Sequence, residues 1–334
     1  MRILLSILLI LVFVPSWTGE PRIPRFGPKA QMTLRPLGIA PGLRSGRLTY
    51  LNGWELHSND PAFGGFGAIA VAGDRFTLLS DGGALVRFTL GGDGIARGVR
   101  FGALPNGPGS GWRKEHRDSE SLAIDPATGT AWAGFEPSEG LPGSIWRYAD
   151  GFDRALGHVE PEAMRGWPVN AGAETLVRLR SGQFVSLSER ATERRKKPLR
   201  AILFDRDPVR PDARAFGFFY RPPVPRSFPT DAAQLPDGNL VVLNRSASLK
   251  RWFRGNVAIV RRSDIRPGAI VAGTLVGRIA PPLPQDNYEG VAVTRERGDT
   301  ILWIVSDDNE SILQRSLLLK FRLEPPAPRR GTAP

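Results

Sequence analysis

The sequence predicts an all-β chain that folds as a single β-propeller of five to six four-stranded blades. Two observations lead to this fold class. First, 38 Gly and 30 Pro among 334 residues are too many for a helical bundle, while 41% hydrophobic residues are too many for a disordered chain. Second, a strand–turn–strand segment recurs along the chain at the spacing expected of propeller blades.

The repeat consists of an apolar strand, a turn rich in Gly and Asp, and a second apolar strand. The first strands are expected at residues 67–71, 120–124, 174–178, 231–235 and 289–293, so they begin 53, 54, 57 and 58 positions apart. The second strands are expected at 76–80, 130–134, 184–188, 240–243 and 301–305. Gly and Asp adopt the backbone conformations that a tight hairpin needs, which favours antiparallel pairing within each repeat. Third strands are expected at 84–90, 144–148, 201–204, 256–260 and 317–323.

The ends of the repeat region indicate how the ring closes. The last repeat has only three strands before Pro325 and Pro326. Two N-terminal strands, at 31–36 and 47–57, have no partner within the repeats. We expect one of them to complete the last blade, whereas a sixth partial blade would form if both paired elsewhere. The propeller domain is thus predicted over 31–324, followed by a flexible tail at 325–334.

The N-terminus is typical of a secretory signal peptide over residues 1–19. Met1 and Arg2 precede a run from 3 to 14 that is apolar except for Ser6, and the small residues Ser16 and Thr18 then suit cleavage near Gly19. The run is shorter than the roughly 20 residues that span a bilayer, and no later segment is long enough. An uncleaved N-terminal anchor is the alternative. Both predict a periplasmic or secreted protein with no stable membrane span in its body.

Composition excludes several kinds of chemistry. The chain has no Cys and only three His, which rules out disulfides, thiolate metal sites and a cysteine nucleophile. The formal charge of +12 is interpreted as a solvated basic surface rather than a polyanion-binding one, because no nucleic-acid-binding motif accompanies it. We expect a monomer with no nucleic-acid partner.

Acidic residues recur at two positions of the repeat. One position opens the first strand, and it holds Gly67, Glu120, Glu174, Asp231 and Glu289. The other follows the second strand, and it holds Asp81, Glu136, Glu189, Asn244 and Asp307. In an antiparallel pair the start of one strand lies beside the end of the next. The two positions are therefore predicted to bring eight carboxylates together on one face, near the central channel.

Such a ring of carboxylates favours a bound cation, because like charges destabilise one another and hard oxygen ligands suit Ca²⁺ or Mg²⁺. Neighbouring residues extend the site: Arg190 and Arg245 directly follow two ring positions, and Asp308 follows a third. We predict catalytic roles for Glu120, Glu174, Glu289 and Asp307. The predicted metal ligands are Asp81, Glu136, Glu189, Asp231 and Asp308, and the predicted substrate-binding residues are Arg190, Arg245 and Asn244. The alternative is that these side chains only cap turns.

Several segments resemble the phytase-like propeller family, known as "esterase-like activity of phytase". The resemblance spans about residues 45 to 323 and rests on segments 63–71, 78–83, 118–122, 287–293 and 305–309. It implies an exported propeller that hydrolyses phosphate or carboxylic esters. The family usually has Ser-Gly-Leu where this chain has Gly67-Ala68-Ile69, so the first blade lacks a polar group there.

Two hypotheses about function remain open from the sequence. The first is a Ca²⁺-assisted hydrolase that acts on a small anionic ester through the acidic ring. The second is a non-catalytic periplasmic propeller whose ring binds a ligand or partner, since propellers serve both roles. Neither a G-x-S-x-G nucleophile elbow nor a phosphate-binding P-loop occurs in the sequence.

Overall fold

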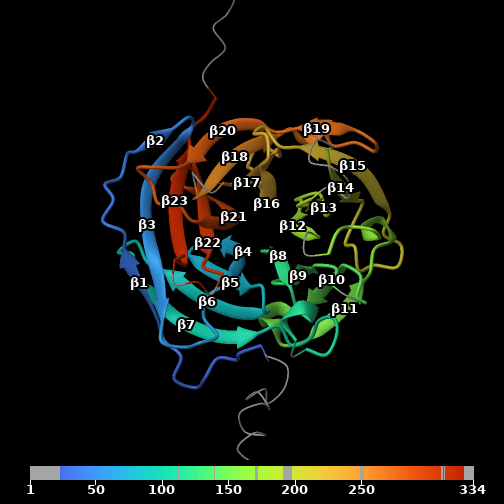
Figure 1. Cartoon of the computed structure of the whole chain (residues 1–334), viewed down its shortest axis with the longest axis horizontal. Helices are drawn as coiled ribbons and strands as arrows, with labels where there is room; N and C mark the ends of the chain where they lie inside the picture. Colours follow the sequence, from blue (N-terminus) through green and yellow to red (C-terminus); the bar gives the residue numbers. More distant parts are fainter. Residues whose placement is uncertain are drawn as a thin grey trace, which may run out of the picture.

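The computed structural model describes residues 23–326 except 112, 139, 170–171, 191–197, 249–251, 310 and 312. In this part of the chain the strands form five sheets arranged in a ring (Figure 1). The predicted signal peptide and most of the predicted tail lie outside the described residues. No helix within the described ranges is long and apolar enough to cross a membrane.

Four sheets follow one another along the chain, and each contains four consecutive strands paired antiparallel, or nearly consecutive ones in blade 4. Blade 1 contains β4 (Phe66–Ala72), β5 (Arg75–Ser80), β6 (Ala84–Leu90) and β7 (Ala96–Ala103). Blade 2 contains β8 (Ser119–Ile124), β9 (Ala131–Phe135), β10 (Ser144–Tyr148) and β11 (Ala155–Val159). Blade 3 contains β12 (Ala173–Arg178), β13 (Phe184–Ser188), β14 (Leu199–Phe204) and β15 (Ala215–Arg221). Blade 4 contains β16 (Phe228–Gln234), β17 (Leu240–Ser248), β18 (Trp252–Val260) and β20 (Thr274–Ile279). The short strand β19 (Ile270–Ala272) adds to blade 3, parallel to β15.

The fifth blade joins the two ends of the propeller. It contains β21 (Asn287–Glu296), β22 (Asp299–Asp307), β23 (Leu317–Leu323) and, from the N-terminal region, β3 (Leu48–Ser58). Strand β3 pairs antiparallel with β23, which confirms the predicted closure of the ring by an N-terminal strand. Two further strands, β1 (Met32–Pro36) and β2 (Arg44–Ser45), pair with β3 in the same sheet. The described residues thus form five blades, within the predicted range of five to six.

Apolar side chains between neighbouring blades make up the core. Where blade 5 meets blade 1, Phe76 stacks on Phe88 and meets Trp303 edge to face, with ring centroids 5.1 and 4.8 Å apart. Burying a side chain of this size stabilises the fold by roughly 1.5–3 kcal/mol. Four short 3₁₀ turns, η1 (Lys114–His116), η2 (Asp150–Phe152), η3 (Glu162–Met164) and η4 (Arg262–Asp264), lie in the connections.

The innermost strands, β4, β8, β12, β16 and β21, contact one another around the ring. Each of them has a β-bulge near its start, where one residue is left out of the pairing with the second strand of its blade. The unpaired residues are Gly67, Glu120, Glu174, Thr230 and Glu289. A bulge redirects the side chain of the extra residue, so these five positions share one local geometry.

Candidate functional site

The bulges and strand pairings show which residues occupy equivalent places in the five blades. Immediately before each bulge, the inner strand pairs with Ser80, Phe135, Ser188, Asn244 or Ser306 of the second strand. The next residue along that second strand is Asp81, Glu136, Glu189, Arg245 or Asp307. In blade 4, therefore, Thr230 and Arg245 occupy the two ring positions at which we predicted Asp231 and Asn244.

Asp231 and Asn244 are instead part of the framework of blade 4. The Asp231 carboxylate accepts hydrogen bonds from the backbone N–H groups of Ala232 and Val291, both at 2.7 Å. It thereby ties β16 to β21. The Asn244 amide is fully buried, accepts a hydrogen bond from the Tyr220 hydroxyl at 3.0 Å and donates to the Val242 carbonyl at 3.1 Å. We predicted that blade 4 contributes an acid and an amide to the ring. Its ring positions are one residue away from the predicted ones, because the bulge falls on Thr230.

We call the equivalent side chains of blades 1, 2, 3 and 5 the central acidic ring. Its members are the carboxylates of Asp81, Glu120, Glu136, Glu174, Glu189, Glu289 and Asp307. Most of them are buried, since Glu174 is 6% and Glu189 only 3% exposed. The one basic side chain at an equivalent place is Arg245.

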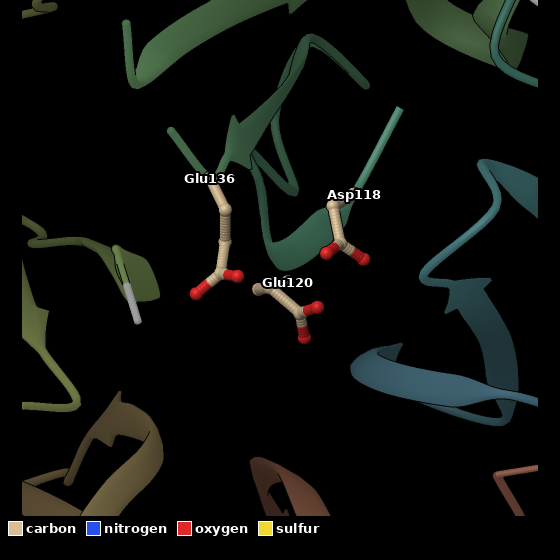
Figure 2. Close-up of side chains that lie close together, drawn as sticks. All are labelled: Asp118, Glu120 and Glu136. Atoms are coloured by element: carbon tan, nitrogen blue, oxygen red, sulfur yellow. The ribbon is translucent and has the colours of Figure 1, made fainter. Parts of the chain in front are cut away.

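Three acidic side chains of blade 2, Asp118, Glu120 and Glu136, lie close together (Figure 2). Carboxylate oxygens of Asp118, Glu120 and Glu136 lie within 4.8 Å of one another. Two oxygens bound to one Ca²⁺ at 2.3–2.6 Å are at most about 5 Å apart, so this group fits the spacing of a shared calcium ion. Glu136 is fixed by a hydrogen bond that its Oε1 accepts from the Gly172 backbone N–H at 2.6 Å.

Sequence reasoning missed Asp118 as a member of this group. Asp118 precedes the bulge residue Glu120 by two positions, and Asn287 precedes the bulge residue Glu289 in the same way. An acid or amide two residues before the acid was therefore the signal that could have identified both side chains.

Burial and mutual repulsion raise the pKa values of these carboxyl groups. Burial raises the pKa of Glu120 well above its usual range, and the neighbouring Asp118 and Glu136 raise it further. Burial also raises the pKa of Glu136 to about 7 and that of Glu174 well above its usual value. A hydrogen bond between these two carboxyl groups lowers the pKa of Glu136 and raises that of Glu174. These opposite shifts are those of a pair in which the Glu174 carboxyl donates the hydrogen bond and the Glu136 carboxylate accepts it.

Arg245 is the basic partner of the ring members Glu189 and Glu289. Its guanidinium donates to Glu189 Oε1 at 2.9 Å and to Asn287 Oδ1 at 2.6 Å, and it also contacts Glu289 directly. Burial lowers the pKa of Arg245, but Glu289 and Glu189 raise it by more. Even with this partner, burial raises the pKa of Glu289 to about 8.

The remaining predicted site residues differ in their exposure and in their partners. Arg190 contacts Glu189 Oε2 through Nε at 3.1 Å, and its side chain is 58% exposed. Asp81 pairs with Lys114 Nζ at 2.7 Å. Asp307 is buried, which raises its pKa to about 7. Asp308 accepts hydrogen bonds from the Gly65 N–H at 3.0 Å and the Ser316 hydroxyl at 2.7 Å, so it also anchors the loop before β4.

Gly67 explains how blade 1 accommodates the acids of blade 2. A Cβ atom at this position would lie 3.1 Å from Glu120 Oε2. This is closer than most real Cβ contacts, so any larger residue would push the Glu120 carboxylate away. The glycine in the bulge of blade 1 leaves the space that the Glu120 side chain occupies.

Comparison with known proteins places the chain in a family. Residues 61–310 match the phytase-like family, described as esterase-like activity of phytase. The chain belongs to this family. Similar solved structures include glutaminyl cyclase from Myxococcus xanthus, with 12% identity, a TM-score of 0.48, and coverage of 84% of this chain and 99% of that one. Another is the Cps50 (Swd1) β-propeller domain of Myceliophteria thermophila, with 10% identity, a TM-score of 0.39, and coverage of 87% and 99%. No curated protein matches the chain in sequence.

The ring of this phytase-like propeller combines three chemical features. It has a group of carboxylates spaced for a divalent cation, buried acidic groups with raised pKa values, and two arginine side chains that contact Glu189. Groups of these kinds can hold a metal ion and transfer protons. The Glu and Asp members predicted from the sequence are brought together, apart from Asp231, whose oxygens are bonded to backbone N–H groups.

Proposed function

We propose that this phytase-like propeller hydrolyses phosphate or carboxylic esters with the help of a divalent cation held in the central acidic ring. Ca²⁺ is the preferred ion and Mg²⁺ the alternative. The observation that carries the proposal is the group formed by Asp118, Glu120 and Glu136, whose oxygens lie within 4.8 Å of one another. Their environment raises the pKa of Glu120 and Glu136, so a cation that replaces the protons would relieve the repulsion.

The three carboxylates of blade 2 would hold the ion. When bound, it would polarise the ester oxygen and increase the acidity of a water molecule. The rest of the ring supplies proton transfer. Glu289, with a pKa of about 8, holds a proton at neutral pH and can donate it to a leaving group. Asp307, with a pKa of about 7, is divided between its two forms at that pH and can accept a proton from water.

Arg190 is the side chain best placed to recognise the anionic part of a substrate. Among the described residues, its partner is Glu189, which it contacts through Nε. The two Nη groups of an exposed guanidinium then remain as a fork that matches a carboxylate or phosphate. Arg245 differs, because its donors are engaged by Glu189, Glu289 and Asn287. We therefore assign substrate binding to Arg190 and a positioning role to Arg245.

The test is turnover of 4-nitrophenyl phosphate and 4-nitrophenyl acetate by chelator-treated protein, before and after Ca²⁺ or Mg²⁺ is added. We expect metal-dependent hydrolysis of at least one of the two ester classes. Glu120→Gln should abolish it. The matched control, Glu162→Gln, should not, because Glu162 is an exposed acid on η3 paired with Arg165. Activity that is insensitive to chelator, or equal in the two variants, would contradict the proposal.

One observation favours the second candidate, a non-catalytic binding propeller. Arg245 already supplies a positive charge beside Glu189 and Glu289 within the protein, so this part of the ring has an internal partner and does not depend on a metal. If no ester is hydrolysed under any metal condition while the protein is folded, this candidate becomes the better one.

The predicted signal peptide adds a cellular location to the proposal. We expect the mature protein to begin near Gly19 or Glu20 and to act in the periplasm or outside the cell. N-terminal sequencing of the protein from fractionated cells tests this. Recovery of an intact Met1 form in the cytoplasmic fraction would contradict export.

A further inference from the structure

We propose that a second site, separate from the central acidic ring, binds a small aromatic anion in the cleft between blades 1 and 2. The cleft has a volume of about 580 Å³, which lies in the range of ligand pockets. It is lined by the end of β4, the start of β5 and the turn η2. These are the strand ends opposite the ones that carry the acidic ring, so the two sites lie on opposite faces of the propeller.

The wall that blade 1 contributes is basic. In its antiparallel pairs, Thr77 lies opposite Arg87, Arg87 opposite Arg100, and Arg75 opposite Thr89. Directly paired residues point to the same side of a sheet, and side chains alternate along each strand. The three arginines and two threonines therefore share one face. The other face carries Phe76 and Phe88, which pack in the core beside blade 5.

The three arginines lack acidic partners in the described part of the chain. Arg97 on the same blade pairs with Asp93, but none of Arg75, Arg87 and Arg100 forms an ion pair there. Like charges directly opposite each other on a sheet are destabilising, and Arg87 and Arg100 form such a pair. An anion bound between them would remove that repulsion.

Blade 2 contributes three apolar side chains to the wall of the cleft. Ile124, Pro126 and Phe152 line it. The Arg87 guanidinium lies 5.9 Å from the centre of the Phe152 ring. Phe152 has a φ of 62°, in the left-handed region that a bulky residue rarely adopts. Residues held in such conformations concentrate at ligand-binding sites, and here the conformation sets the ring beneath an arginine.

Two acidic side chains also line the cleft, and neither reverses its charge. Asp125 is paired with Arg178 at 3.0 Å. Asp150 is an exposed residue whose carboxylate lies against Gly129. The balance of three arginines against these two acids, one of them neutralised, leaves the cleft basic.

The lining indicates the class of ligand. A phosphonate, phosphate or sulfonate group would bind to the guanidinium groups of Arg75, Arg87 and Arg100. The hydroxyls of Thr77 and Thr89 would complete its hydrogen bonds. An aromatic ring attached to that group would pack against Ile124 and Phe152. The inference does not depend on hydrolysis at the acidic ring, because no residue is shared between the two sites.

The test is a calorimetric titration of the whole protein with phenylphosphonate, which has no ester bond to hydrolyse, in the presence of a chelator. The chelator keeps metal out of the acidic ring, and variants of Arg87 and Arg100 separate binding in the cleft from binding at Arg190, which they leave intact. We expect saturable binding to one site, and weaker binding of inorganic phosphate and of benzyl alcohol, which each carry half of the recognised features.

Variants locate the binding. Arg87→Gln and Arg100→Gln should each weaken phenylphosphonate binding by about tenfold, the effect of losing one charged hydrogen bond. Arg200→Gln is the matched control, because Arg200 also lies on the third strand of its blade but outside the cleft. Arg100 is exposed, so its variant should fold even if Arg87→Gln does not. Absence of saturable binding, or equal affinity in all three variants, would overturn the inference.

Discussion

Blades 2 and 4 bring opposite charges to the same ring through the same backbone geometry. In blade 2 the bulge and the end of the second strand carry Glu120 and Glu136, and Asp118 joins them. In blade 4 the equivalent places carry Thr230 and Arg245. In each of the five blades, the backbone therefore fixes where the side chain at the bulge and the side chain after the second strand meet. The residue types then decide whether an internal cation lies among the acids, as Arg245 does, or whether carboxyl groups face one another, as around Glu120.

Removing the internal cation should have the largest effect. Arg245→Met leaves Glu189 and Glu289 buried without their partner. Loss of one partner from a buried ion pair typically costs about 3–5 kcal/mol. We expect the free energy of unfolding, measured by urea titration at pH 8.5, to fall by roughly this amount. A loss below about 1 kcal/mol, the range of exposed pairs, would show that Arg245 does not hold the two acids in solution.

Substitutions of Asp231 test whether this acid supports the framework of blade 4 or binds a metal. Asp231→Ala leaves the Val291 N–H unsatisfied in the interior, which should cost about 1–3 kcal/mol whether or not Ca²⁺ is present. Asp231→Asn keeps an acceptor oxygen and should cost less. Thermal denaturation with chelator and with Ca²⁺ measures both variants. If the stability loss appeared only with Ca²⁺, Asp231 would be a metal ligand and not a framework acid.

The raised pKa values predict how the calcium-free protein responds to pH. Glu136 and Asp307 have pKa values of about 7 and Glu289 of about 8, against about 4 in an unfolded chain. Between pH 4 and 8 the folded state therefore binds more protons than the unfolded state, so stability falls as pH rises. We expect Tm to be lower at pH 8.5 than at pH 5, and Ca²⁺ to restore it at the higher pH. A Glu136→Gln/Glu289→Gln double variant should show a flatter dependence, whereas a Tm that rises over this interval would contradict the assignment.

Arg190 should contribute least to stability. It is exposed, and its contact with Glu189 is of the kind worth about 0.2–1 kcal/mol. Arg190→Gln should therefore leave Tm nearly unchanged while raising KM for an anionic ester and leaving kcat close to wild type. If stability falls as far as in Arg245→Met, the two arginines share one structural role and Arg190 is not a substrate-binding residue.

Much of the fold could be predicted from the sequence, because the signals of the blade repeat lie within short segments of the chain. Each hairpin combines two apolar strands with a Gly- or Asp-rich turn, and such signals need no long-range information. The closure by β3 followed from counting, since the last repeat lacked a strand. The pairing of β1 with β3 could not be derived, because the contacts that select it come from residues far apart in the chain.

The candidate site was predicted less completely, for a reason that one residue illustrates. The apolar pattern of residues 231–235 places Asp231 at the start of a strand, but the bulge of β16 falls on Thr230. Bulge position depends on pairing with the second strand and is not visible in hydrophobicity. That shift moved Asp231 and Asn244 into the framework and brought Arg245 into the ring. Asp118 was missed because it lies outside the apolar strand used to align the repeats.

We propose that the acids of blade 2 share an external cation. A calcium titration of the chelator-treated protein, followed by scanning calorimetry at pH 8.5, tests this directly. Stabilisation of wild type should grow with Ca²⁺ concentration and reach about 2.7 kcal/mol at a hundredfold excess over the dissociation constant. A Glu120→Gln/Glu136→Gln double variant should lose most of this gain while its calcium-free form stays folded, and Glu162→Gln should keep it. An unchanged Tm of wild type across the titration would contradict the claim.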